Sequence, residues 1–77
     1  MKTSIDIHGL TEAMAIKEIE QTIAKLPKEA KELIVIHGHR SGDALKQMVA
    51  SPYKIRSKRI KRRRYSKNPG ETILELY

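Results

Sequence analysis

Residues 3–8, near the start of this chain of 77 residues, have the pattern of a strand, with hydrophobic and polar residues in alternation from Ser4 onward. The alternation places Ile5 and Ile7 on one face of a strand and Asp6 and His8 on the other. A glycine follows the histidine, where the chain must turn sharply toward the next element. The pattern predicts a short, half-buried strand that ends at a histidine.

The spacing of the apolar residues then changes to that of a helix. Thr11 is a suitable N-cap, and Pro27 stops the helix after about Leu26. The apolar stripe of this helix consists of Ile16, Ile19, Ile23 and Leu26. The spacing therefore predicts an amphipathic helix that lies on a sheet.

Residues 33–36 are an unbroken apolar run, which indicates an interior parallel strand covered on both faces. A strand, a helix and a second strand form a right-handed βαβ unit. A shorter helix is predicted at about residues 43–51, and Pro52 ends it. The side chains that this helix would bury are Leu45, Met48 and Val49.

The last third of the chain predicts a hairpin. Residues 58–65 would form a strand with arginine on one face, and residues 71–77 a closing strand, joined by the turn signal Asn68-Pro69-Gly70. One face of the closing strand carries Thr72, Leu74 and Leu76. The predicted order is βαβαββ. We expect a single α/β domain over residues 1–77, a two-layer α+β arrangement of two helices on a four-stranded mixed sheet.

The net charge of +7 is concentrated in the same part of the chain. Residues 1–53 hold seven Lys/Arg and seven Asp/Glu, whereas residues 54–77 hold nine Lys/Arg and two Glu. Such a concentration indicates a polyanionic partner, and tyrosines near it can stack on unpaired bases. A solvated surface that protects a sheet edge is the alternative. The predicted nucleic-acid-binding residues of this segment are Lys54, Arg56, Lys58, Arg59, Lys61, Arg62, Arg63 and Arg64.

The chain contains no cysteine, which excludes disulfides and thiolate metal clusters. No apolar stretch approaches the roughly 18 residues that span a bilayer. The N-terminal residues also lack the apolar region of a signal peptide. We expect a cytoplasmic protein with no membrane partner, and the sequence makes no prediction of its oligomeric state.

Ile-Asp-Ile-His-Gly at residues 5–9 recurs as Ile-Val-Ile-His-Gly at residues 34–38. If the two strands are parallel neighbours, His8 and His37 meet at the sheet edge where open α/β sheets bind ligands. Asp6 beside His8 would orient the ring as in a general acid–base pair. The candidate catalytic residues are Asp6, His8 and His37, and a purely structural turn is the alternative. Such a trio can hold a divalent metal, but the spacing is not diagnostic, so no cofactor is predicted.

A loop with glycines follows the second histidine. Backbone amides and an arginine there would cradle a phosphate. The predicted nucleic-acid-binding residues of this loop are Gly38, His39, Arg40 and Gly42. The Walker pattern is absent, so nucleotide hydrolysis is not expected.

These motifs resemble those of the small MutS-related (Smr) domain family over essentially the whole chain. Residues 5–11 are similar to its L-D-L-H-G-L-T motif, residues 34–38 to its I-I-H-G motif, and residues 70–76 to its closing strand. The loop departs from the family's H-G-K-G-x-G pattern by one glycine. The resemblance implies a βαβαββ fold like the C-terminal domain of translation initiation factor 3, and binding of DNA or RNA. It also implies endonuclease activity in several members, with cleavage roles for Asp6 and His8.

We therefore predict a nucleic-acid-binding domain that favours RNA over DNA, with endonuclease activity left open and the ribosome as a candidate location of its substrate. RNA is the easier substrate because its 2′-hydroxyl supplies a nucleophile. The alternative is a non-catalytic adaptor that docks on ribosomal RNA or on an acidic protein. A small hydrolase of phosphorylated metabolites is ranked last, because the basic segment exceeds what that task needs.

Overall fold

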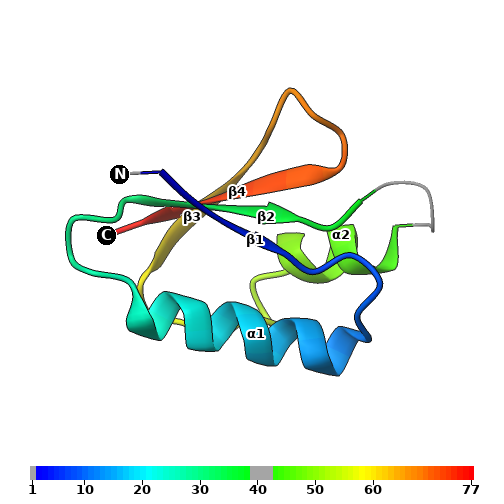
Figure 1. Ribbon diagram of the computed structural model, residues 1–77, viewed down its shortest axis with the longest axis horizontal. Helices are drawn as coiled ribbons and strands as arrows, with labels where there is room; N and C mark the ends of the chain where they lie inside the picture. The colour runs from blue at the N-terminus through cyan, green and yellow to red at the C-terminus, as the bar shows by residue number, and fades with distance from the viewer. Residues whose placement is uncertain (1, 39–42) are drawn as a thin grey trace.

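All six predicted elements are present in the structure, a computed structural model that describes residues 2–38 and 43–77. The elements in chain order are β1 (Lys2–Asp6), α1 (Glu12–Lys25), β2 (Glu32–Ile36), α2 (Ala44–Ala50), β3 (Ile60–Tyr65) and β4 (Glu71–Leu76). The predicted fold of two helices on a four-stranded mixed sheet is confirmed (Figure 1).

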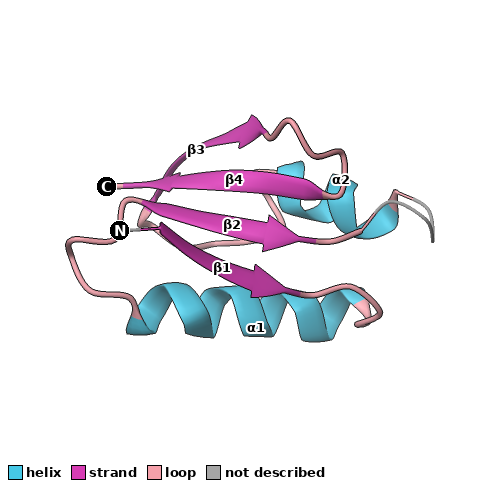
Figure 2. Ribbon diagram, turned by 45° about the horizontal axis from the view of Figure 1, so that its top comes forward, coloured by secondary structure: helices cyan, strands magenta, loops and turns pink. Residues whose placement is uncertain are grey.

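The strands lie in the order β1-β2-β4-β3 (Figure 2). β1 and β2 pair in parallel, with Ile5 opposite Val35, and β4 is antiparallel to both of its neighbours. The predicted hairpin is formed by β3 and β4, with Arg63 opposite Leu74. β3 therefore runs in the same direction as β2, although β4 separates the two strands.

The long helix begins at the predicted cap. The Thr11 hydroxyl accepts a hydrogen bond from the Met14 N–H at 3.2 Å, which satisfies one of the free amides of the first turn. The helix ends at Lys25, two residues before Pro27. Its buried side chains are Ala15, Ile19 and Ile23.

Both helices lie on the same face of the sheet, which corrects the expectation that β2 is covered on both faces. Leu33 and Val35 are fully buried, whereas Ile34 and Ile36 on the other face are only half-buried. The topology explains this. The connections β1-α1-β2 and β2-α2-β3 both advance in one direction across the sheet, and right-handed crossovers of that kind place their helices on one side.

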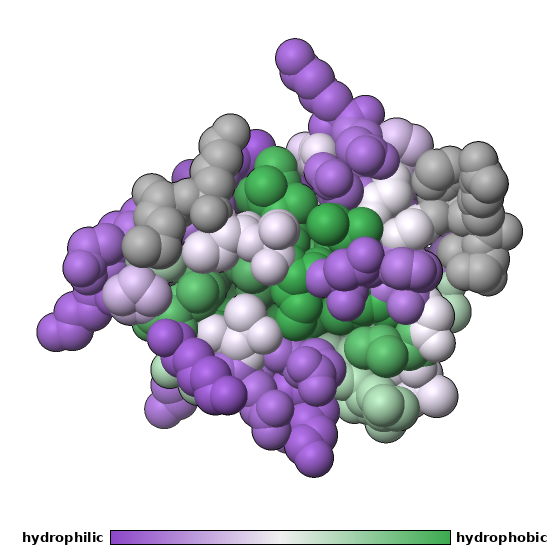
Figure 3. Space-filling model, in the orientation of Figure 1, coloured by the Kyte–Doolittle hydropathy of each residue, from purple (hydrophilic) through white to green (hydrophobic). Residues whose placement is uncertain are grey.

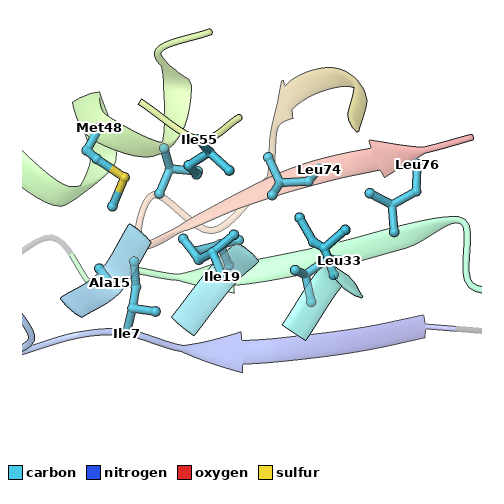
Figure 4. Close-up of a cluster of buried hydrophobic side chains, with 11 residues drawn as sticks. Ile7, Ala15, Ile19, Leu33, Met48, Ile55, Leu74 and Leu76 are labelled. Carbon is cyan, nitrogen blue, oxygen red and sulfur yellow. The ribbon is translucent and has the colours of Figure 1, made fainter. Parts of the chain in front are cut away.

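One hydrophobic core therefore lies between the sheet and the helices (Figure 4). It contains side chains from strands β2 and β4, from both helices, and from the segments that follow β1 and α2. Its members are Ile7, Ala15, Ile19, Ile23, Leu33, Val35, Met48, Val49, Ile55, Leu74 and Leu76.

On the face seen in Figure 3, hydrophilic side chains project around a smaller hydrophobic middle. Within the described part of the chain, no helix has the length and apolar character that crossing a membrane requires.

Candidate nucleic-acid interface

The strands β1, β2 and β3 all end at one edge of the sheet. Asp6 at the end of β1 lies opposite Ile36 at the end of β2, and Ile36 lies opposite Glu71 at the start of β4. Tyr65 at the end of β3 is opposite Thr72. We call this the carboxyl edge and define it by residues 6–9, 36–38 and 65–72. Both His-Gly turns lie on it, as predicted.

Asp6 and His8 form a hydrogen-bonded pair on this edge. Asp6 Oδ1 accepts from the His8 backbone N–H at 3.0 Å and lies 2.5 Å from ring Nδ1. Because a carboxylate oxygen only accepts, Nδ1 carries the proton and Nε2 is left to exchange one. The His8 side chain is 71% exposed, and no residue in the described part of the chain bonds Nε2. The pair has the geometry of an oriented general base.

The hydrogen bond from the His8 ring lowers the pKa of the Asp6 carboxyl below its ordinary value of 3.8, and the His8 backbone N–H lowers it further. A carboxyl whose pKa is lower in the folded state stabilises the fold above about pH 4, and this contribution is lost as the pH falls through the lowered pKa. We expect NMR titration of the Asp6 carboxyl carbon to give a midpoint below 3.8. In His8→Ala the midpoint should rise toward that value. An unchanged midpoint would mean that the ring does not bond the carboxylate.

His37 is placed differently from His8. Its side chain is buried, with only 2% of the residue exposed. Ring Nδ1 donates to the Gly38 carbonyl oxygen at 2.8 Å, so in the neutral ring Nε2 accepts from the Thr72 hydroxyl at 2.9 Å. His37 therefore does not present a second imidazole beside His8, contrary to the geometry on which its catalytic assignment was based.

The register explains the difference between the two histidines. Asp6 is opposite Ile36, so the next positions along the strands place Ile7 beside His37 and His8 beside Gly38. The two copies of the motif are thus offset by one residue, and an offset of one moves a side chain to the other face of the sheet. Consistent with this, a Cβ added to Gly38 would lie 3.6 Å from the His8 Cβ.

Gly38 also connects the end of β2 to the hairpin turn. Its φ of +76° is a left-handed conformation that favours glycine. The N–H groups of His37 and Gly38 both donate to the Gly70 carbonyl oxygen, at 2.9 and 3.0 Å. The predicted site residues His39, Arg40 and Gly42 lie outside the described residues. Of the four predicted loop residues, the structure therefore describes Gly38.

Arg59 serves the fold. Its guanidinium donates from Nη1 to the carbonyl oxygens of Ile23 at 3.3 Å and Leu26 at 2.7 Å. Nη2 donates to Pro27 O and, at 3.0 Å, to Ala30 O. These carbonyls lie at and just beyond the C-terminus of α1, where helix carbonyls lack partners and the helix dipole favours a cation.

Arg63 has a similar role at the end of α2. Its register opposite Leu74 directs it to the helix side of the sheet. Nε donates to Val49 O at 2.8 Å and Nη2 to Ile55 O at 3.4 Å. Partial burial lowers the pKa of this guanidinium, which nevertheless stays charged at neutral pH. The guanidinium groups of Arg59 and Arg63 are therefore occupied by backbone carbonyl oxygens, so they are not available to a polyanion that binds at the surface.

Arg62 and Arg64 lie on the opposite face of the sheet, where they are paired with acids. Arg62 Nε is 2.8 Å from Glu75 Oε1, and Arg64 Nε is 2.5 Å from Glu75 Oε2. Arg64 also pairs with Glu32 through Nη2. The hydrogen bond from Arg64 is the main reason that the pKa of Glu75 is lowered. The positive charge of these two arginines is thus balanced locally.

The other basic side chains of the segment face solvent. Lys54 is 3.0 Å from Glu12 across an exposed ion pair, a kind of contact that stabilises weakly. The remaining exposed bases are Arg56, Lys58, Lys61 and Lys67. The nine bases therefore do not form one uniform surface.

Thr72 is the residue at this edge that the sequence analysis did not assign to the site. It is 3% exposed and holds His37 Nε2. The sequence pattern did indicate that Thr72 would be buried, because it alternates in phase with Leu74 and Leu76 on one face of β4. Among the described residues, no group of three or more His, Cys, Asp or Glu is arranged to hold a metal ion.

The comparisons with known proteins identify the fold. No protein-family model and no curated protein matches the sequence. Among solved structures, the chain is similar to the crystal structure of the Smr domain of Thermus thermophilus MutS2, with a TM-score of 0.81 and 25% sequence identity. The match covers 97% of this chain and 98% of that chain. Together with the Ile-Asp-Ile-His-Gly and Ile-His-Gly turns at the carboxyl edge, this match supports the identification of the chain as a small MutS-related (Smr) domain.

Proposed function

We propose that this Smr domain binds nucleic acid, RNA in preference to DNA, along the carboxyl edge and cleaves it with His8. The observation that carries the proposal is the Asp6–His8 pair. It is exposed, the carboxylate fixes the proton on Nδ1, and Nε2 has no hydrogen-bond partner among the residues that the structure describes. Gly38 lies beside the pair and carries no side chain; a Cβ added there would be 3.6 Å from the His8 Cβ.

RNA supplies the chemistry that a single imidazole can assist. His8 Nε2 accepts the proton of the 2′-hydroxyl, and the 2′-oxygen attacks the adjacent phosphorus. The bond from phosphorus to the 5′-oxygen breaks, which leaves a 2′,3′-cyclic phosphate. The departing 5′-oxygen takes a proton from solvent to become a hydroxyl, and His8 releases its extra proton to solvent. DNA has no 2′-hydroxyl and cannot react in this way.

The exposed basic side chains supply affinity for nucleic acid. Arg56, Lys58, Lys61 and Lys67 are available to phosphates, whereas Arg59 and Arg63 are occupied by backbone carbonyls. With four to six phosphate contacts, log affinity for a single strand should fall with log salt with a slope of roughly −3 to −4. A slope near zero would exclude an electrostatic interface.

One observation favours the adaptor as a second candidate. Because His37 is buried, the described residues present one exposed imidazole rather than two, and among them no second ring is placed to serve as the acid. An adaptor that docks on ribosomal RNA would need the exposed lysine and arginine side chains but not the Asp6–His8 pair.

The test follows binding and strand breakage together. Fluorescently labelled single-stranded RNA, single-stranded DNA and duplex DNA are titrated with the protein at four salt concentrations, with and without Mg²⁺. Salt-dependent binding with RNA-specific breakage is expected. Salt-dependent binding with no breakage under any condition would support the adaptor, and the absence of binding would reject both functions.

A further inference from the structure

We propose that Tyr65 and Lys46 form a subsite for one unpaired nucleobase and its phosphate, at the end of the carboxyl edge next to α2. The inference rests on the proposed function and specifies the ligand as a single-stranded segment. It concerns residues on the far side of the hairpin from His8, neither of which belongs to the Asp6–His8 pair.

Tyr65 is an exposed aromatic residue at a position where the fold holds it in place. It is the last residue of β3, its backbone pairs with Thr72, and 76% of it is exposed. By register it lies on the helix side of the sheet, as Arg63 does, and so faces the side on which α2 lies. Strand pairing holds the backbone of Tyr65, and its exposed ring offers a planar surface to a ligand.

Lys46 brings a cation to this ring. It belongs to α2, and its Nζ lies 5.8 Å from the centroid of the Tyr65 ring. Within the described residues, no carboxylate pairs with Lys46, in contrast to Lys54 with Glu12 and Arg64 with Glu75. The ammonium therefore has only a weak partner in the ring and is available to a phosphate.

A shallow pocket adjoins the ring. Ala50, Arg63, Arg64, Tyr65 and Thr72 line it. Of the two arginines, Arg63 lies on the same side of the sheet as Tyr65, and Val49 O already accepts a hydrogen bond from its guanidinium. Ala50 lies one helical turn after Lys46, on the same side of α2. Ala50 is thus apolar, and Arg63 and Thr72 are already hydrogen-bonded, so this lining suits a nucleobase more than a second charged group.

The pocket is connected to the catalytic candidate by direct contacts. Thr72 in its lining bonds His37, whose own neighbour Gly38 lies against His8. By register His8 lies on the face of the sheet away from the helices and Tyr65 on the helix side, so a nucleic-acid strand that passes both would cross the carboxyl edge from one face to the other. In a duplex both faces of a base are stacked, so a Tyr65 platform selects unpaired bases.

The other two tyrosines serve as matched controls. Tyr53 and Tyr77 are 80% and 65% exposed, but among the described residues neither ring has a cation over it. Tyr77 follows β4, whose end lies at the opposite edge of the sheet from the end of β3. The proposal therefore predicts a specific effect of Tyr65 that general aromatic exposure does not.

The experiment compares a single-stranded RNA 12-mer with an abasic phosphodiester oligomer of equal length and charge. We expect the wild type to bind the 12-mer about tenfold more tightly than the abasic oligomer, since one stacked base contributes a factor of about 5 to 150. Tyr65→Phe should keep this preference. Tyr65→Thr, which suits a strand, should abolish it, whereas Tyr77→Thr should not. Lys46→Gln should weaken binding to both oligomers and reduce the salt slope by about 0.7.

The outcomes separate this proposal from the function on which it rests. Equal binding of the two oligomers by the wild type, with a steep salt slope, would overturn the base subsite and leave the nucleic-acid interface intact. A preference that survives in Tyr65→Thr would also overturn it. If neither oligomer binds, the proposed function itself fails. The wild-type comparison requires no variant to fold, and circular dichroism would check each variant.

Discussion

Replacing His8 by alanine should reduce RNA cleavage by a factor of about 10² to 10⁴ and leave RNA affinity nearly unchanged. The expected loss follows from the geometry, because Nε2 of His8 is the exposed proton acceptor and Asp6 fixes the proton on Nδ1. The fold should not suffer, because the side chain is largely exposed. Single-turnover cleavage of a labelled RNA, with binding measured in the same samples, would give both quantities.

A matched variant separates orientation from proton transfer. Asp6→Asn leaves His8 in place but removes the carboxylate that holds its ring, so we expect a smaller loss of cleavage than in His8→Ala. His37→Gln, at a buried position, should instead lower thermal stability. Cleavage that persists at the wild-type rate in both His8→Ala and Asp6→Asn would remove the assignment of this pair.

Replacing Arg59 by alanine should lower the free energy of unfolding by about 3 kcal/mol. The substitution leaves the carbonyls of Leu26, Pro27 and Ala30 without their charged donor, and it removes a cation from the C-terminus of α1. In a domain of this size the melting temperature should fall by roughly 12–24 °C. Urea denaturation followed by far-ultraviolet circular dichroism would measure the loss.

Two substitutions control for charge. Arg56→Ala removes one positive charge from an exposed side chain in the same segment, so its effect on stability should stay within about 0.5 kcal/mol. Arg59→Lys keeps the charge but loses the fork of donors, and we expect an intermediate stability. Equal stability of Arg59→Ala and Arg56→Ala would mean that the carbonyl contacts contribute nothing.

The sequence predicted the elements well because their signals are local. The helical spacing between Thr11 and Leu26 and the alternation in residues 71–76 each arise within one element. The strand from Ile60 to Tyr65 could also be predicted, although its apolar positions are sparse, because the turn signal and the closing strand required a partner. The single covered face of β2 could not be read from an unbroken apolar run, since it depends on the direction in which both crossovers advance.

The candidate site was harder to predict because it depends on register. The two His-Gly turns look equivalent in sequence, yet an offset of one residue between β1 and β2 directs His8 outward and His37 inward. The roles of the basic side chains were hard to predict for the same reason. A shift of register between Ile60 and Arg62 decides which arginines face the helices, and the carbonyls that Arg59 binds lie about 30 residues earlier in the chain.

The shared Gly70 carbonyl makes two distant parts of the chain one mechanical unit. Because the amides of His37 and Gly38 converge on a single acceptor, the hairpin turn cannot swing away without releasing both. The exit of β2 and the turn should therefore open together in one cooperative fluctuation rather than independently. A ligand that binds the hairpin would reduce the motion of the backbone beside His8. Binding at one end of the carboxyl edge would therefore be coupled to the other end through dynamics, without a change of average structure.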